Sequence, residues 1–149
     1  MEKLEKLKPS DMEEAVTLFQ NGLAMEIPQG KMEKNVIAEE LSKTTCLVHR
    51  SNKGIDGLAN FRHNRSNSIT ILFICTSKPG NGIGTTLMHK IASMAIAQKA
   101  PWIYSGVSSR DKRAMRFYHS LGFRPYRKTR RFGYYIKTRP KQILKRSTV

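Results

Sequence analysis

"SITILFICTSKPGNGIGTTLM", residues 68–88, runs from an apolar segment through a glycine-rich turn into a second apolar segment. The first segment, 68–77, is apolar almost throughout, which is typical of a strand buried in the middle of a sheet. The segment 82–99 repeats apolar residues at helical spacing. Strand, glycine turn and helix together predict one crossover unit of an α/β fold, in which the next strand pairs in parallel.

The glycines of this turn do not match the common phosphate-binding templates. A P-loop needs Lys and then Ser or Thr directly after its last glycine, whereas Gly84 is followed by Thr85 and Thr86. A G-x-G-x-x-G fingerprint begun at Gly80 and Gly82 needs a third glycine where Thr85 stands. What remains is a helix N-terminus, with unpartnered N–H groups and a positive dipole end. This arrangement predicts either a tight turn without a ligand or a binding site for a bulky anion. In the second case the hydroxyl groups of Thr85 and Thr86 would be further hydrogen-bond donors to the anion.

The rest of the chain predicts a mixed α/β domain with helices on both faces of a mostly antiparallel sheet. On the helices, Ala15, Leu18, Phe19 and Leu23, and then Val36, Ile37 and Leu41, are expected to face inward. The chain is expected to form a single domain over 1–140, with a basic tail over 141–149. Helices are predicted over 10–23, 32–43, 82–99 and 111–122, and strands over 2–9, 44–50, 55–63, 68–77 and 102–108, with two more within 123–137.

Composition excludes several classes of protein. With 149 residues and 39% hydrophobic content, the chain is long and apolar enough to fold as one domain. No apolar run approaches the roughly 18 residues of a membrane span, and the N-terminus lacks a signal-peptide core. Cys46 and Cys75 lie in apolar strand segments and form neither a disulfide framework nor a metal-binding spacing. We therefore expect a cytoplasmic protein with reduced thiols and without a membrane or metal partner.

Charge is the unusual property of the sequence. The formal net charge is +16, and residues 57–149 hold nineteen of the 27 Lys and Arg residues but a single acid, Asp111. Ten of these bases lie in 124–146 together with Tyr126, Phe132, Tyr134 and Tyr135. A charge of this size in one half favours an anionic partner, because bases neutralise phosphates and aromatic rings stack on nucleobases. A merely solubilising surface remains the alternative.

Two segments together resemble the GNAT N-acetyltransferase superfamily. That family carries R/Q-x-x-G-x-G/A after its fourth strand and later a segment similar to N-x-x-A-x-x-F-Y-x-x-L-G-F. Gly82 and Gly84 match the loop glycines, and "DKRAMRFYHSLGF", residues 111–123, matches the second segment from Ala114 to Phe123. The glycine turn alone is weakly specific, but the two segments in this order and separation are strongly so. The resemblance covers most of the chain and is strongest over 69–124.

The resemblance implies the acyl-CoA N-acyltransferase fold and acetyl-CoA as cofactor. The pyrophosphate of acetyl-CoA would lie on the backbone N–H groups of residues 80–85, and its pantetheine arm would pair with the backbone of residues 74–76 between the fourth and fifth strands. The cofactor-binding residues that the resemblance implies are Ile74, Cys75, Thr76, Gly80, Asn81, Gly82, Ile83, Gly84, Thr85 and Asp111.

The sequence departs from the family pattern at two positions. Pro79 stands where the family has Arg or Gln, so that a side-chain donor to phosphate is missing. Lys78, or one of Arg110, Lys112 and Arg113, is a possible replacement. Asp111 stands where the family often has Asn, and an acid there caps a helix but does not donate to a cofactor.

Acetyl transfer to an amine requires a deprotonated amine, a stabilised oxyanion and a protonated leaving thiolate. The resemblance implies Tyr118 as the general acid, against the alternative of a core tyrosine, and a backbone N–H near Ile74 or Cys75 for the thioester oxygen. For the general base we expect His63, with Glu26, Glu33 or an ordered water as alternatives. Cys75 is interpreted as a core residue rather than a nucleophile.

The basic half predicts an acetyltransferase whose acceptor is, or is associated with, nucleic acid, a ribonucleoprotein or another polyanion. Two other functions stay open. One is a nucleic-acid-binding module on this fold that has lost catalysis, and the other is an ordinary small-amine or protein N-acetyltransferase with a basic surface. For the assembly we expect a monomer or a homodimer.

Overall fold

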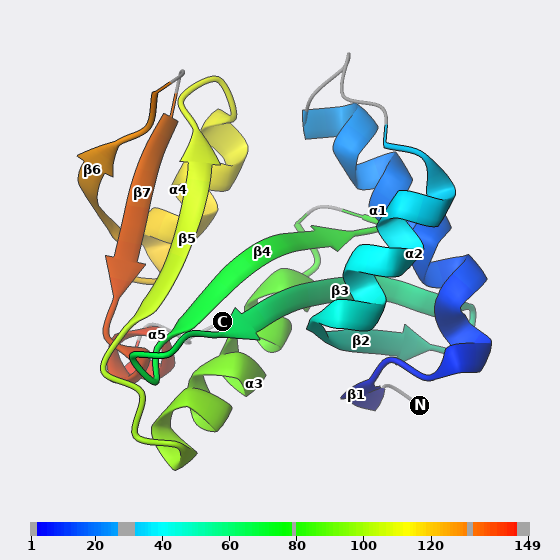
Figure 1. The fold of residues 1–149 in the computed structure, drawn as a ribbon, viewed down its shortest axis with the longest axis horizontal. Helices are drawn as coiled ribbons and strands as arrows, with labels where there is room; N and C mark the ends of the chain where they lie inside the picture. The colour runs from blue at the N-terminus through cyan, green and yellow to red at the C-terminus, as the bar shows by residue number, and fades with distance from the viewer. Residues whose placement is uncertain (1–2, 27–31, 79, 131–132, 146–149) are drawn as a thin grey trace. The chain divides into compact units, whose positions relative to one another are not determined.

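The computed structural model describes residues 3–26, 32–78, 80–130 and 133–145 (Figure 1). Pro79, on which one departure from the family pattern rests, lies outside the described residues. Helices and strands follow the predicted order, with one 3-10 turn and one short C-terminal helix in addition. The elements are β1 Lys3–Lys6, η1 Pro9–Asp11, α1 Met12–Glu26, α2 Lys34–Lys43, β2 Thr45–Ser51, β3 Gly54–His63, β4 Ile69–Thr76, α3 Ile83–Ala97, β5 Ile103–Ser108, α4 Lys112–Ser120, β6 Arg124–Lys128, β7 Gly133–Thr138 and α5 Pro140–Lys145.

The seven strands are hydrogen-bonded in the order β1-β2-β3-β4-β5-β7-β6, with β4 in the middle as predicted. β4 and β5 run parallel, with residues 69–71 opposite residues 103–105. The pairs β1–β2, β2–β3, β5–β7 and β6–β7 are antiparallel. The parallel pair is the one that α3 connects, which is the crossover that the strand, glycine turn and helix predict. The prediction of a mixed, mostly antiparallel sheet flanked by helices is confirmed.

The chain divides into two compact units, Met1–Phe61 with Phe73–Leu87, and Arg62–Leu72 with Met88–Val149. In the first unit, α1 and α2 share one core with β2, β3 and the second half of β4. Gly22 of α1 lies so close to β4 that an added Cβ would stand 2.9 Å from the Cβ of Cys75. The residues of this core are Ala15, Val16, Leu18, Phe19, Ile37, Leu41, Cys46, Val48, Ile55, Leu58 and Cys75.

Five of the seven residues predicted to face inward on the first two helices are buried, namely Ala15, Leu18, Phe19, Ile37 and Leu41. Val36 was expected inward, but 42% of its surface is exposed, while Ile37 and Leu41 are buried. The prediction was wrong because positions 37 and 41 lie one above the other on a helix, whereas position 36 is rotated by about 100° from position 37. The side chain of Leu23 lies outside the described residues.

A glycine on β3 lets the N-terminus of α3 lie directly against the first unit's sheet. A Cβ added at Gly57 would stand 2.5 Å from Cγ2 of Ile83 and 3.3 Å from Cδ1 of Leu87, the first buried residues of α3. The next residue, Leu58, faces the core with α1 and α2. Because successive side chains alternate across a strand, α3 begins on the opposite face from α1 and α2.

We expect Gly57→Ala to lower the free energy of unfolding by about 1–3 kcal/mol, because the methyl group overpacks the contact with Ile83. Chemical denaturation measures the loss. Gly106→Ala is the matched control, since nothing lies within 4 Å of its Cβ position, and it should change stability by less than about 0.5 kcal/mol. In a double-mutant cycle, Ile83→Ala should offset part of the Gly57→Ala cost. Strictly additive costs would contradict this account of the contact.

In the second unit, β5 buries one side and exposes the other. Ile103, Ser105 and Val107 are buried, and so are Ile136 and Thr138 on the neighbouring strand β7. α4 packs against β5 and therefore against this buried side. β6 lies at the end of the strand order, and all five of its residues are exposed.

The β6–β7 pairing contains an irregularity. The register shifts between Pro125 and Arg127, which marks a bulge around Tyr126. Pro125 itself has no N–H group to give to a ladder. β6 is therefore an irregular, charged edge strand.

The C-terminal segment differs from the predicted basic tail. Residues 140–145 form helix α5, in which Pro140 and Ile143 are buried. Ile143 is completely inaccessible to solvent, so its burial anchors the helix. Residues 146–149 lie outside the described part of the chain. Within the described part, no helix is long and apolar enough to cross a membrane.

Candidate active site

The turn between β4 and α3 has two glycines in the left-handed region of backbone space. Gly80 has φ +85° and Gly82 has φ +83°. A Cβ added at either position would find no atom within 4 Å, so both backbone segments face open space. Glycine is required here by the dihedral angle rather than by a close neighbour. The turn thus exposes backbone to which a bulky group has access.

Part of the hydrogen-bonding capacity at the start of α3 is already used. The Asn81 Oδ1 atom accepts the N–H of Ile83 at 3.2 Å. Thr86 donates both its N–H and its hydroxyl to the carbonyl oxygen of Gly82, each at 3.0 Å. The Thr86 hydroxyl, which we expected as a donor to an anion, is therefore engaged within the helix.

The remaining donors of the first turn belong to two residues. Gly84 and Thr85 are the second and third residues of α3, so their N–H groups have no carbonyl partner within the helix. Both lie at the positive end of the helix dipole. This pair lies at the helix N-terminus beside the open backbone of Gly80 and Gly82, where the sequence predicts a site for an anion.

The second half of β4 lies in the same unit as the turn. Cys75 is buried, and its thiol donates to the carbonyl oxygen of Leu18 at 3.7 Å, which agrees with its interpretation as a core residue. Thr76 donates its hydroxyl to the carbonyl of Lys78 at 3.2 Å and so stabilises the exit from the strand. Burial raises the pKa of the other thiol, Cys46, to about 12, so that it also has no nucleophilic character.

A histidine–aspartate pair supports the beginning of the turn, and sequence reasoning missed it. His49 on β2 is only 3% exposed, and its Nδ1 lies 2.6 Å from Oδ1 of Asp56 on β3. The Asp56 carbonyl accepts the N–H of Ser77, the first residue after β4, at 2.8 Å. A bulge between His49 and Arg50 puts Asp56 beside the ring, and no signal in the sequence indicates that bulge.

Asp111 and Tyr118 belong to α4 in the second unit. The Asp111 carboxylate caps the helix by accepting the N–H of Ala114 at 3.0 Å, as the sequence predicted for an acid at this position. Tyr118 is 6% exposed, and its ring packs edge-on against Phe117 and Phe123, with centroids 5.3 and 5.1 Å away. These contacts fix the orientation of the phenol ring.

The expected general bases lie on different elements. His63 is exposed at the end of β3 and belongs to the second unit. Glu33 is exposed at the N-cap of α2 in the first unit, while the side chain of Glu26 lies outside the described residues. The structure thus gathers the turn and residues 74–76 in one unit, and Tyr118 and His63 in the other.

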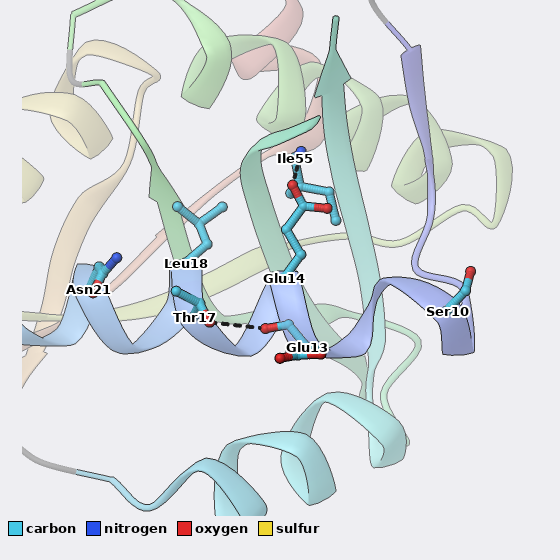
Figure 2. Close-up of a pocket in the computed structure, with 7 residues that line it drawn as sticks. All are labelled: Ser10, Glu13, Glu14, Thr17, Leu18, Asn21 and Ile55. Atoms are coloured by element: carbon cyan, nitrogen blue, oxygen red, sulfur yellow. Dashed lines mark hydrogen bonds between the residues drawn. The ribbon is translucent and has the colours of Figure 1, made fainter. Parts of the chain in front are cut away.

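A hollow of about 520 Å³ lies along α1 in the first unit and contains none of the predicted site residues (Figure 2). Two carboxylates, those of Glu13 and Glu14, line the hollow. The Glu14 carboxylate accepts the N–H of Ile55 at 2.8 Å and lies against Gly54. Thr17 donates to the carbonyl of Glu13 at 3.1 Å. The bond between Glu14 and Ile55 connects α1 to β3, and the bond between Thr17 and Glu13 lies within α1, so that both polar groups have structural partners.

Comparison with known proteins gives a consistent result. A family model described as an acetyltransferase (GNAT) domain matches residues 12–138. No curated protein matches the sequence significantly. Several solved structures share the fold at low sequence identity.

Three of these structures illustrate the likeness. The PaiA N-acetyltransferase of Thermoplasma acidophilum, in complex with coenzyme A, is 12% identical with a TM-score of 0.81, and the match covers 93% of this chain and 99% of that one. A GNAT-family acetyltransferase of Staphylococcus aureus is 15% identical with a TM-score of 0.82, covering 94% and 99%. YncA of Salmonella typhimurium, with its cofactor acetyl-CoA, is 15% identical with a TM-score of 0.74, covering 94% of each chain.

Proposed function

The chain belongs to the GNAT acetyltransferase family, and from this premise we propose that it transfers an acetyl group from acetyl-CoA to an amine on nucleic acid, or on a molecule associated with nucleic acid or another polyanion. The observation that carries the cofactor part is the turn before α3, with its two left-handed glycines and open backbone. The observation that carries the acceptor part is the charge of residues 57–149.

The turn fits the diphosphate part of acetyl-CoA. The N–H groups of Gly84 and Thr85 have no helical partner, and the positive dipole end of α3 favours an anion. Gly80 and Gly82 add open backbone, while Asn81 and Ile83 bond to each other and shape the turn. Exposed Lys78, in the same unit, is the nearest cation in sequence that would take the place of the family's Arg or Gln.

The backbone of residues 74–76 would hold the pantetheine arm. β4 pairs in parallel with β5 through residues 69–71, which belong to the second unit, whereas residues 74–76 belong to the first. Peptide groups of an extended strand bind a second extended amide chain by hydrogen bonds. Acetyl-CoA, when bound, supplies the acetyl group as an activated thioester.

Two side chains would handle the protons. Tyr118 would hold, on its phenol oxygen, the proton that the leaving thiolate takes up, and its fixed ring would keep that oxygen in one place. His63 would accept the proton of the acceptor amine, directly or through water. Asp111 would act through the helix that it caps, because its carboxylate already accepts the Ala114 N–H. Cys46 and Cys75 are buried and form no disulfide, which fits the reducing cytoplasm as the location.

Calorimetry with acetyl-CoA tests the cofactor part. We expect one saturable site with a dissociation constant of about 1 μM to 1 mM, the usual range for enzyme substrates. Pantetheine, which lacks the diphosphate, should bind much more weakly if the turn holds that group. If acetyl-CoA does not bind, the transferase proposal is wrong, and the alternative of a nucleic-acid-binding module without catalytic activity applies.

A screen of acceptors, read out as CoA release, tests the acceptor part. Fractions that contain nucleic acid or ribonucleoprotein should release CoA, and nuclease treatment should abolish the release. CoA release only with small amines or free peptides would contradict the proposal of a polyanion-associated acceptor. The protein would then be an ordinary N-acetyltransferase with a basic surface.

A further inference from the structure

One face of the β5-β7-β6 sheet carries rings and cations instead of a covering helix. Side chains alternate across a strand, and the opposite face is the buried one against which α4 packs. The register places Tyr104 opposite Lys137, and Arg127 opposite Tyr135. We call this surface the tyrosine face and define it by Tyr104, Tyr126, Arg127, Tyr135 and Lys137.

The rings of the tyrosine face are in contact with one another and remain open to solvent. Tyr126 is 47% exposed and Tyr135 is 43% exposed, and these are two of four large apolar side chains exposed in the described residues. Their centroids lie 6.5 Å apart with the planes tilted by 35°. Tyr104 supports Tyr126 edge-on at 5.8 Å. Rings held in this way offer their outer surfaces for stacking at little entropic cost.

Cations surround these rings. Lys137 Nζ lies 5.0 Å from the Tyr126 centroid and 4.1 Å from that of Trp102. A hollow of about 380 Å³ at the β6–β7 hairpin is lined by Tyr126, Tyr135, Thr129 and three bases, Arg127, Lys128 and Arg130. Among the described residues, no acid lines it.

The positive charge of the tyrosine face is not neutralised by its own half of the chain. The one acid in residues 57–149 is Asp111, whose carboxylate caps α4. Burial, with the neighbouring Tyr104 as a further cause, raises the pKa of Tyr126, so that its phenol stays neutral. A partner that covers this surface must therefore bring negative charge and flat apolar groups together.

We propose that the tyrosine face binds single-stranded RNA, with bases stacked on Tyr126 and Tyr135 and phosphates held by Arg127 and Lys137. A paired duplex hides the faces of its bases in the stack, whereas the exposed rings of Tyr126 and Tyr135 require free base faces. Proteins usually recognise RNA through unpaired bases that stack on aromatic side chains. This inference rests on the proposed function, in which the acceptor is associated with a polyanion, and it identifies that polyanion as RNA.

Fluorescence anisotropy tests the inference with the full-length protein and a 5′-labelled, unstructured 12-nucleotide RNA, without acetyl-CoA. Tyr126→Ala and Tyr135→Ala should each weaken binding about 5- to 100-fold, the range for losing one stacked base. Tyr126→Phe keeps the ring and should stay within about twofold of wild type. Arg127→Ala and Lys137→Ala should each lower the salt slope of log K by about 1.

Arg116→Ala is the matched charge control, because Arg116 is exposed on α4, which covers the opposite face. If Arg116→Ala weakens binding as much as Arg127→Ala, or if Tyr126→Ala and Tyr135→Ala both bind as wild type, the inference is overturned in favour of a diffuse basic surface. Equal affinity for single-stranded DNA or duplex RNA also overturns it. Failure here, with intact acetyl-CoA binding in calorimetry, removes the RNA site and leaves the transferase proposal.

Discussion

We expect replacement of Thr85 by Asp to weaken acetyl-CoA binding about 100-fold while the fold stays at least as stable. Thr85 is the third residue of α3, and its N–H is one of the two donors without a helical partner. A carboxylate there would repel a diphosphate by about 3 kcal/mol at about 5 Å and an effective dielectric constant of about 20. The same carboxylate favours the helix by about 0.3–1 kcal/mol, because it lies at the positive end of the dipole.

The opposite signs of these two effects make the result specific. Calorimetry measures the affinity, and chemical denaturation measures the stability. Thr85→Asn is the matched control, since it has nearly the same shape as Asp without the charge, and it should lose less than about tenfold in affinity. Equal affinities for the Asp and Asn variants would mean that no phosphate lies at this helix end.

We expect Tyr118→Phe to lower kcat about 100-fold or more, with little change in acetyl-CoA affinity. General acids contribute about 10²- to 10⁴-fold to rates, and the substitution removes only the phenol oxygen. The ring contacts with Phe117 and Phe123 remain, so that the free energy of unfolding should change by no more than about 1 kcal/mol. CoA release with the acceptor found in the screen gives kcat and KM.

Tyr134→Phe controls for the loss of a tyrosine hydroxyl, since Tyr134 is a half-buried tyrosine of β7 that takes no part in the proposed proton transfers. It should keep kcat within about twofold. A Tyr118→Phe enzyme with unchanged kcat would instead show that Tyr118 is a core residue, which its 6% exposure also permits.

The crossover of β4, turn and α3 was predictable because three signals agree there. The apolar run of β4, the glycines of the turn and the apolar stripe of α3 each predict the same arrangement. Together with the segment of residues 111–123 around Tyr118, the glycine turn indicates the GNAT family. These signals are local in sequence, so they can be recognised without knowledge of tertiary contacts.

The features that sequence missed depend on contacts between distant segments. Val36 and Ile37 are both apolar, and only the packing of α2 decides which one is buried. The basic residues around Ile143 predict a tail, although residues 140–145 form α5 with Pro140 and Ile143 buried. The Asp56–His49 pair depends on a bulge in the β2–β3 register. Spacing along the chain contains no record of such bulges.

The edge strand β6 has a consequence for how other chains can approach the protein. A peptide that adds to a sheet needs a regular row of free N–H and C=O groups along the edge. On β6 a proline and a bulge interrupt that row, and Arg124, Arg127 and Lys128 surround it with positive charge. β-augmentation and edge-to-edge self-association are therefore both disfavoured at β6, which leaves this end of the sheet to partners that bind through their side groups and charges.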